Sequence, residues 1–68
     1  MPHRRYDMGQ QVRVRPLPLF DTHAEYVGVI YDYRASRRTW LYEIEQPDGT
    51  IERSVAQDRL LPVSQEER

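Results

Sequence analysis

The chain has 68 residues, of which 38% are hydrophobic and 31% are charged, with a formal net charge of −1. This length excludes two domains and any fold of repeated βαβ units, which take roughly 30 residues or more each. The absence of cysteine excludes disulfides and thiolate metal sites. Without a run of 18 apolar residues or a secretory signal, we expect a cytoplasmic protein that does not contact a membrane.

The charges are unevenly distributed along the chain. All ten basic residues are arginines; residues 1–38 hold seven of them against four acids, and residues 39–68 hold three against seven. This asymmetry of +3 against −4 can steer a charged partner. An ordinary solvated, arginine-rich surface explains the same numbers, so both interpretations stay open.

The first half predicts two strands separated by a long loop. Residues 11–15 alternate two valines with two arginines, which is typical of a half-buried strand. Prolines at positions 16 and 18 end it, and residues 16–25 read as an irregular loop. Residues 26–33 form the second strand, with apolar residues on both faces, as in a strand covered on each side or bent by a bulge at Gly28.

The second half predicts a hairpin and a short closing strand. Residues 39–46 alternate, residues 47–49 supply a Pro-Asp-Gly turn, and residues 50–55 pair back as the fourth strand. Residues 56–59 fit one 3₁₀ turn before a last strand at 60–61. We therefore predict a flexible N-terminal tail over residues 1–6, one all-β domain over 7–63 and a polar C-terminal tail over 64–68. The expected core consists of Val12, Val14, Ile30, Trp40, Ile44 and Leu60.

This order of elements resembles the SH3-like β-barrel superfamily, in its bacterial small-barrel form. The segments that carry the resemblance are 8–13 (MGQQVR), 28–30 (GVI), 40–44 (WLYEI), 48–49 (DG) and 58–62 (DRLLP). The resemblance implies a single five-stranded barrel with a short 3₁₀ turn before the last strand. Within the superfamily, the chain looks like the hemimethylated-DNA-binding (heat-shock protein Q) group at residues 9–13, at residues 28–30 and at Trp40. In that group two aromatic residues are adjacent, whereas here Leu41 separates Trp40 from Tyr42.

Catalytic and cofactor signals are weak. The opening at 8–13 is also similar to the plasmid-type, trimethoprim-resistant dihydrofolate reductases, but residues 51–55 (IERSV) lack the Gln-Ile-Tyr run of that family. The two histidines, His3 and His23, lie in an expected tail and loop, and neither the three isolated glycines nor the serines form a known catalytic motif. We predict a protein that is not an enzyme and has no metal site and no cofactor.

Binding is therefore the expected function, and two classes of ligand stay open. A protein partner is favoured, because Tyr and Arg concentrate binding energy at interfaces. The candidate residues for it are Phe20, Tyr26, Tyr31, Tyr33, Arg34, Arg37, Arg38 and Tyr42. The alternative is nucleic acid, DNA or RNA, held by the arginines of the first half. The candidate residues for it are Arg13, Arg15, Arg34, Arg37 and Arg38.

A homo-oligomer is a separate hypothesis. The domain is small enough that its own core is thin. Residues 27–31 are apolar on both faces of the expected strand, so a second subunit could cover the outer one.

Overall fold

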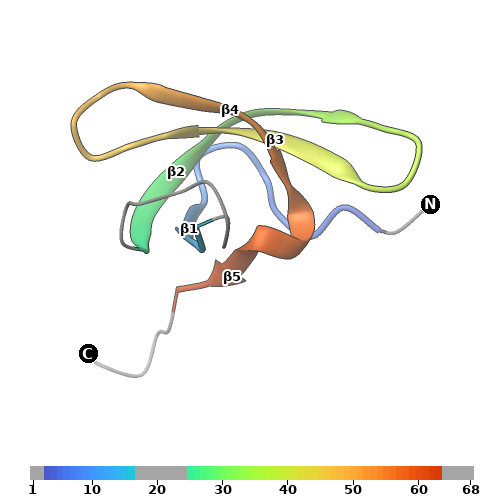
Figure 1. The fold of residues 1–68 in the computed structure, drawn as a ribbon, viewed down its shortest axis with the longest axis horizontal. Helices are drawn as coiled ribbons and strands as arrows, with labels where there is room; N and C mark the ends of the chain where they lie inside the picture. Colours follow the sequence, from blue (N-terminus) through green and yellow to red (C-terminus); the bar gives the residue numbers. More distant parts are fainter. Residues whose placement is uncertain (1–2, 17–24, 64–68) are drawn as a thin grey trace.

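The computed structural model describes residues 3–16 and 25–63, which form five antiparallel strands and one short 3₁₀ helix (Figure 1). The elements are β1 (Gln11–Val14), β2 (Tyr26–Ala35), β3 (Trp40–Glu45), β4 (Ile51–Ala56), η1 (Gln57–Arg59) and β5 (Leu60–Pro62). Their order in the sheet is β4-β3-β2-β1-β5. The predicted all-β class, the five strands and the 3₁₀ turn before the last strand are confirmed.

Strand β2 joins the two halves of the sheet. Its first residues pair with β1, with Tyr26 opposite Val14 and Val29 opposite Gln11, and its later residues pair with β3. Figure 1 shows β2 curving from the layer of β3 and β4 down to β1. The bend comes with a register shift between Ile30 and Asp32, so the bulge lies at residue 31 and its predicted position at Gly28 is wrong.

Gly28 is instead a point of close approach. A Cβ built on this buried residue would lie 2.8 Å from the backbone oxygen of Glu45 and closer still to Cγ2 of Ile44. Real Cβ atoms do not make such contacts, so a side chain here would push β2 away from β3. Glycine at position 28 is therefore required by packing, not by a bulge.

Strand β4 carries a second irregularity, at Ser54. The β3–β4 register shifts between Tyr42 and Ile44, which face Val55 and Glu52. Ser54 has a φ of 59°, in the left-handed region that residues with a Cβ adopt at a cost of roughly 1 kcal/mol. The extra residue turns Arg53 and Ser54 outward while Val55 stays in the core.

Replacing Ser54 by glycine should leave the domain as stable or make it more stable, by up to about 1 kcal/mol. The gain comes from removing the Cβ from a left-handed position, and the loss is one exposed hydrogen bond from Arg34 Nη2 to Ser54 Oγ. Urea unfolding measures the change. Arg53→Gly is the matched control and should cost about 0.5–1 kcal/mol; equal destabilisation by both changes would contradict the interpretation.

The core lies between β1 and β5 on one side and β2, β3 and β4 on the other. Its buried hydrophobic residues are Tyr6, Val12, Val14, Ile30, Tyr42, Ile44, Val55 and Leu60. Five of the six expected core residues are among them. The sixth, Trp40, is only partly buried, because it pairs with Ala35 at the far end of the β2–β3 hairpin and packs against the rim of the core.

Tyr6 is the largest departure from the predicted organisation. The sequence predicts it in a flexible tail, yet it is 4% exposed and its ring packs edge-on against Tyr42, with centroids 5.8 Å apart. Its hydroxyl donates to the backbone oxygen of Leu60 at 3.3 Å. The folded unit therefore includes residues before position 7.

Candidate functional site

The expected partner-binding residues do not form one surface. Phe20 lies outside the described residues. Tyr42 is fully buried, so its ring is not available to a partner. Tyr26 is half-buried and donates its hydroxyl to Glu52 Oε1 at 2.5 Å. Tyr31, at the β2 bulge, is 57% exposed.

Arg34 lies on the outer face of the sheet, in a small charged cluster. Glu43 Oε2 accepts from Arg53 Nη1 at 3.1 Å and lies 4.0 Å from Arg34 Nη1. The Glu43 carboxylate, whose side chain is only 17% exposed, is thus held between two arginines. Since these charges are already paired with one another, we expect the cluster to hold its own side chains in place on the outer face of β3 and β4.

Two more arginines of the nucleic-acid alternative are engaged within the domain. Arg13 Nε forms an ion pair with Glu25 at 3.0 Å, and Arg15 Nη2 donates to the backbone oxygen of Asp58 at 2.7 Å. Arg13 lies on β1 and Arg15 directly follows it, whereas Arg37 and Arg38 follow β2 at the far end of the hairpin. The five arginines therefore do not make a single basic stripe.

The remaining candidates gather where the β2–β3 hairpin ends. The rings of Tyr33 and Trp40 meet at 78°, with centroids 5.8 Å apart, and form a corner. Arg37 and Arg38 are exposed in the connecting turn and make no side-chain hydrogen bond or ion pair with another described residue. Arg38 also lines a hollow of about 390 Å³ together with Arg5, Thr39, Gln57 and Asp58. We call Arg5, Tyr33, Arg37, Arg38 and Trp40 the hairpin-end surface.

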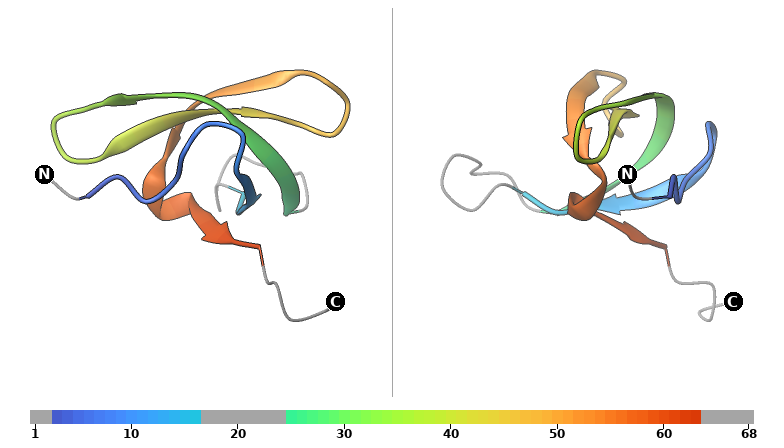
Figure 2. Two further views of the ribbon diagram at one scale, coloured as in Figure 1. Left: turned by 180° about the vertical axis from the view of Figure 1, so that it is seen from behind. Right: turned by 90° about the vertical axis from the view of Figure 1, so that its right-hand side faces the viewer.

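The N-terminal segment, residues 3–7, completes this surface. Both views of Figure 2 show the chain after the N-terminus running beside the hairpin end before it enters β1. The guanidinium carbon of Arg4 lies 4.2 Å from the centroid of Tyr33 and 5.9 Å from that of Trp40. Arg4 Nη1 also donates to the backbone oxygen of Tyr6 at 2.9 Å and to the carboxylate of Asp7, a bond that raises the pKa of Arg4.

Gln57 fastens the N-terminal segment to the domain. Its Oε1 accepts from the Tyr42 hydroxyl at 2.5 Å and from the backbone N–H of Arg5 at 3.0 Å. Its Nε2 donates to the backbone oxygen of His3 at 2.9 Å. Gln57 is the buried polar residue among those described, and these three bonds satisfy its amide. Sequence reasoning missed this role because the partners are more than 50 residues away along the chain, apart from Tyr42.

The buried hydroxyl of Tyr42 makes stability depend on alkaline pH. Burial raises the pKa of Tyr42 above its ordinary value of 10.0, because the ionised phenolate would lose its hydration. As pH rises past about 10, the unfolded chain therefore loses this proton before the folded protein does. The free energy of unfolding decreases over this range, until the pH reaches the pKa of Tyr42 in the folded protein. Urea midpoints between about pH 8 and 11 should show a flatter decline for Tyr42→Phe than for the wild type. The exposed Tyr31→Phe is the control and should keep the wild-type decline.

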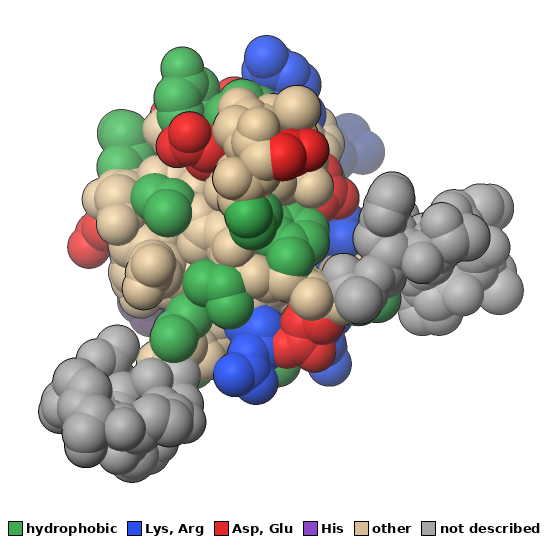
Figure 3. Space-filling model, turned by 90° about the vertical axis from the view of Figure 1, so that its left-hand side faces the viewer, with side chains coloured by type: hydrophobic (Ala, Val, Ile, Leu, Met, Phe, Trp, Pro, Cys, Tyr) green, Lys and Arg blue, Asp and Glu red, His purple; other side chains and the backbone are tan. Residues whose placement is uncertain are grey.

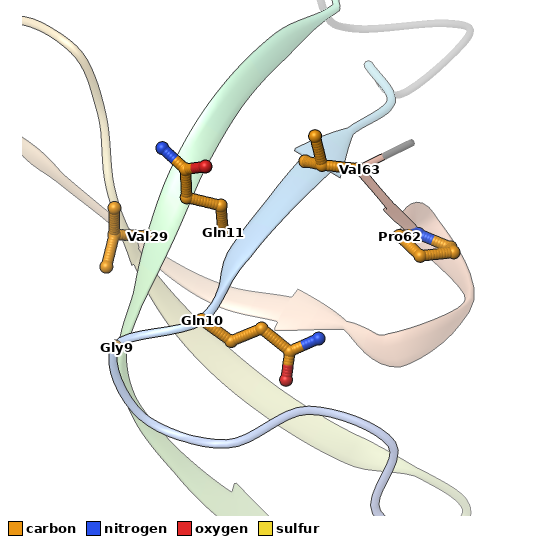
Figure 4. Close-up of a pocket in the computed structure, with 6 residues that line it drawn as sticks. All are labelled: Gly9, Gln10, Gln11, Val29, Pro62 and Val63. Atoms are coloured by element: carbon orange, nitrogen blue, oxygen red, sulfur yellow. The ribbon is translucent and has the colours of Figure 1, made fainter. Parts of the chain in front are cut away.

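A second hollow lies beside the start of β1 (Figure 4). It has a volume of about 710 Å³ and is bounded by Val29 on one side and by Pro62 and Val63 on the other, with Gly9, Gln10 and Gln11 between them. None of the six described residues that line it is ionisable or aromatic. It offers side-chain amides and small apolar groups, but no acid, base or nucleophile for catalysis.

Exposed apolar side chains are dispersed. The large ones among the described residues are Met8, Val27, Tyr31 and Leu61. On the face drawn in Figure 3, hydrophobic groups form several small patches, with charged and other groups between the patches. Val27 and Leu61 flank the ion-paired Arg13 across the register of β2, β1 and β5. The homo-oligomer stays a prediction, and sedimentation as a monomer at high micromolar concentration would contradict it.

Three further findings concern cofactors, membranes and relatives. Residues 3–16 and 25–63 contain no group of three or more His, Asp or Glu side chains that could hold a metal ion. They also contain no helix long and apolar enough to cross a membrane. No protein-family model matches the sequence, and no solved structure matches the chain significantly.

Proposed function

We propose that this chain is a small, non-catalytic interaction module of the SH3-like barrel type, which binds a protein partner through the hairpin-end surface. The strand order β4-β3-β2-β1-β5, with a 3₁₀ turn leading into the last strand, supports the fold part of this proposal. We also propose that the sheet closes into a barrel.

One observation carries the functional part. At the hairpin end, two half-buried aromatic rings lie next to two exposed arginines that have no ion-pair partner among the described residues. Aromatic and arginine side chains contribute most where they are already ordered by neighbours and can be desolvated by a partner. The other arginine clusters of the surface, around Glu43 and Glu25, have already formed their pairs. The free cations favour a partner segment with carboxylates.

A peptide-display selection tests this function directly. Peptides selected on the intact domain should bind the double variant Arg37→Ala, Arg38→Ala at least about tenfold more weakly, by fluorescence anisotropy. Arg53→Ala, which removes one exposed charge on the outer face, should bind within about twofold of the wild type. Selected peptides that bind the double variant and the wild type equally would refute the proposed surface.

Nucleic acid is the second candidate, because the same unpaired Arg37 and Arg38 adjoin rings on which a base can stack. Anisotropy with a short duplex and a single strand should then show binding that weakens steeply as salt rises. That slope should decrease in the Arg37→Ala, Arg38→Ala variant and persist in Arg53→Ala. Absence of binding tighter than about 10 μM at low salt would leave the protein partner as the proposal.

A further inference from the structure

The corner between Tyr33 and Trp40 is already occupied, by a side chain of the same chain. Arg4 places its guanidinium over the Tyr33 face at 4.2 Å and within 5.9 Å of the Trp40 ring centre. Both distances lie within the roughly 6 Å over which a cation is attracted to the negative face of a ring. The two rings meet nearly at right angles, so one cation contacts both.

Acceptors complete the site around the cation. The backbone oxygen of Tyr6 and the carboxylate of Asp7 both accept from Arg4 Nη1. A planar guanidinium can stack on a ring while its N–H groups donate in its own plane, which an ammonium group cannot do. The arrangement of rings and acceptors therefore matches arginine better than lysine.

The ion pair that helps to hold Arg4 in the corner is accessible to solvent, and such pairs contribute little. The side chain of Arg4 is 30% exposed, and Asp7, its ionic partner, is 80% exposed. The backbone on either side is held independently of the guanidinium, by Gln57 through His3 and Arg5 and by the buried ring of Tyr6. Removal of the Arg4 side chain should therefore take this cation out of the corner and leave the fold in place.

We propose that the Tyr33–Trp40 corner is a binding site for an arginine side chain of the partner, and that Arg4 is its intramolecular competitor. The inference deepens the proposed function and rests on it for the identity of the ligand as a protein segment. The partner's arginine would take the place of Arg4 over Tyr33, and its flanking carboxylates would reach Arg38 at the adjoining hollow.

The test uses the full chain with Arg4→Ala and three short capped peptides, Gly-Arg-Gly, Gly-Lys-Gly and Gly-citrulline-Gly. Citrulline keeps the planar shape of arginine without its charge. Binding is followed by NMR on the indole N–H of Trp40, the single tryptophan of the chain. We expect Arg4→Ala to bind the arginine peptide with a Kd on the order of 1 mM, and the wild type to bind it at least about tenfold more weakly, since Arg4 competes at a high effective concentration. The lysine and citrulline peptides should bind Arg4→Ala several-fold more weakly than the arginine peptide.

A second variant ties the binding to the ring. Arg4→Ala combined with Tyr33→Leu keeps an apolar side chain against Trp40 and Tyr42 but removes the aromatic face, and it should lose arginine-peptide binding. Arg4→Ala combined with Tyr33→Phe should keep it. Equal shifts with all three peptides, unchanged binding in the leucine variant, or no binding to Arg4→Ala up to about 20 mM would each overturn the inference.

These results separate the inference from the proposed function. If the display-selected peptides lose affinity in Arg37→Ala, Arg38→Ala while the corner ignores arginine, the surface is correct and the chemistry assigned to the corner is wrong. If the corner binds arginine but no display-selected peptide depends on Arg37 and Arg38, the corner stands and the larger binding surface fails.

Discussion

Replacing Gly28 by alanine is expected to destabilise the domain by about 3 kcal/mol, near the upper end of the effects of overpacking. The added Cβ would meet the backbone oxygen of Glu45 at 2.8 Å, together with the side chain of Ile44. A backbone atom cannot rotate away as a side chain can. Relief therefore requires β2 and β3 to separate, at the centre of the sheet and beside the buried Ile44.

Urea unfolding of Gly28→Ala against Gly9→Ala separates this clash from the general cost of changing a glycine. Gly9 has a φ of 85° and no atom within 4 Å of its built Cβ, so alanine there should cost only about 1 kcal/mol, through backbone strain. A smaller loss at position 28 than at position 9 would show that the strands can move apart easily, and the close approach would lose its importance.

The second large effect is expected at Gln57. Its replacement by leucine keeps a similar volume but removes the acceptor of the Tyr42 hydroxyl and of the Arg5 N–H. The buried Tyr42 hydroxyl left without an acceptor costs about 1–3 kcal/mol, and the part-buried Arg5 N–H, which water can reach, adds less, so Gln57→Leu should destabilise the domain by about 2–3 kcal/mol. Hydrogen exchange at the Arg5 amide should accelerate at the same time, since the N-terminal segment loses its attachment.

A double-mutant cycle tests the bond itself. Tyr42→Phe alone should cost about 1 kcal/mol, whereas in the Gln57→Leu background it should restore about 1 kcal/mol or more, because it removes a buried hydroxyl that no longer has an acceptor there. Gln46→Leu, in the exposed β3–β4 turn, is the control and should change stability by no more than about 0.5 kcal/mol. Strict additivity of Tyr42→Phe and Gln57→Leu would mean that their hydrogen bond contributes little.

The sequence was most informative where one local pattern determined the structure. The alternation of residues 11–15 and 39–46 predicted strands that the structure shows at Gln11–Val14 and Trp40–Glu45. The Pro-Asp-Gly turn at 47–49 predicted that residues 50–55 pair back with the preceding strand, and β4 does pair with β3. In that turn Gly49 has a φ of 92°, and the Asp48 carboxylate accepts from the backbone and hydroxyl of Thr50, which lowers the pKa of Asp48. Period and turn chemistry are properties of neighbouring residues, so they can be read without the fold.

The features that the sequence did not predict depend on contacts between distant residues. Tyr6 has no periodic neighbours, and its burial follows from the space between Tyr42 and Leu60. The alternation of residues 39–46 predicts Trp40 on the same face as the buried Ile44, but its place at the hairpin end leaves it only partly buried and leaves the interior to Tyr42. The sequence of β2 also could not show which residue forms the β-bulge, since both faces of the strand carry apolar side chains.

The residues of the candidate site also divide into those that the sequence predicted and those that it did not. Arg37 and Arg38 were named from composition, because a polar connection between strands exposes its charges. Arg4 was not named, because its place over Tyr33 depends on the path of the N-terminal segment. The ion pairs of Arg13 with Glu25, and of Arg34 and Arg53 with Glu43, likewise could not be predicted without the strand register. These pairs separate the arginines that have an acidic partner from those that have none among the described residues.

The two outermost strands bear on how the molecule behaves in a crowded solution. An outer strand with unsatisfied amides is a template onto which a neighbouring chain can add, and growth of that kind ends in fibrils. Here β5 is three residues long and ends at Pro62, which has no amide hydrogen to donate. At the opposite margin, the left-handed turn at Ser54 interrupts β4. Both margins of the sheet are thus poor seeds for lateral polymerisation.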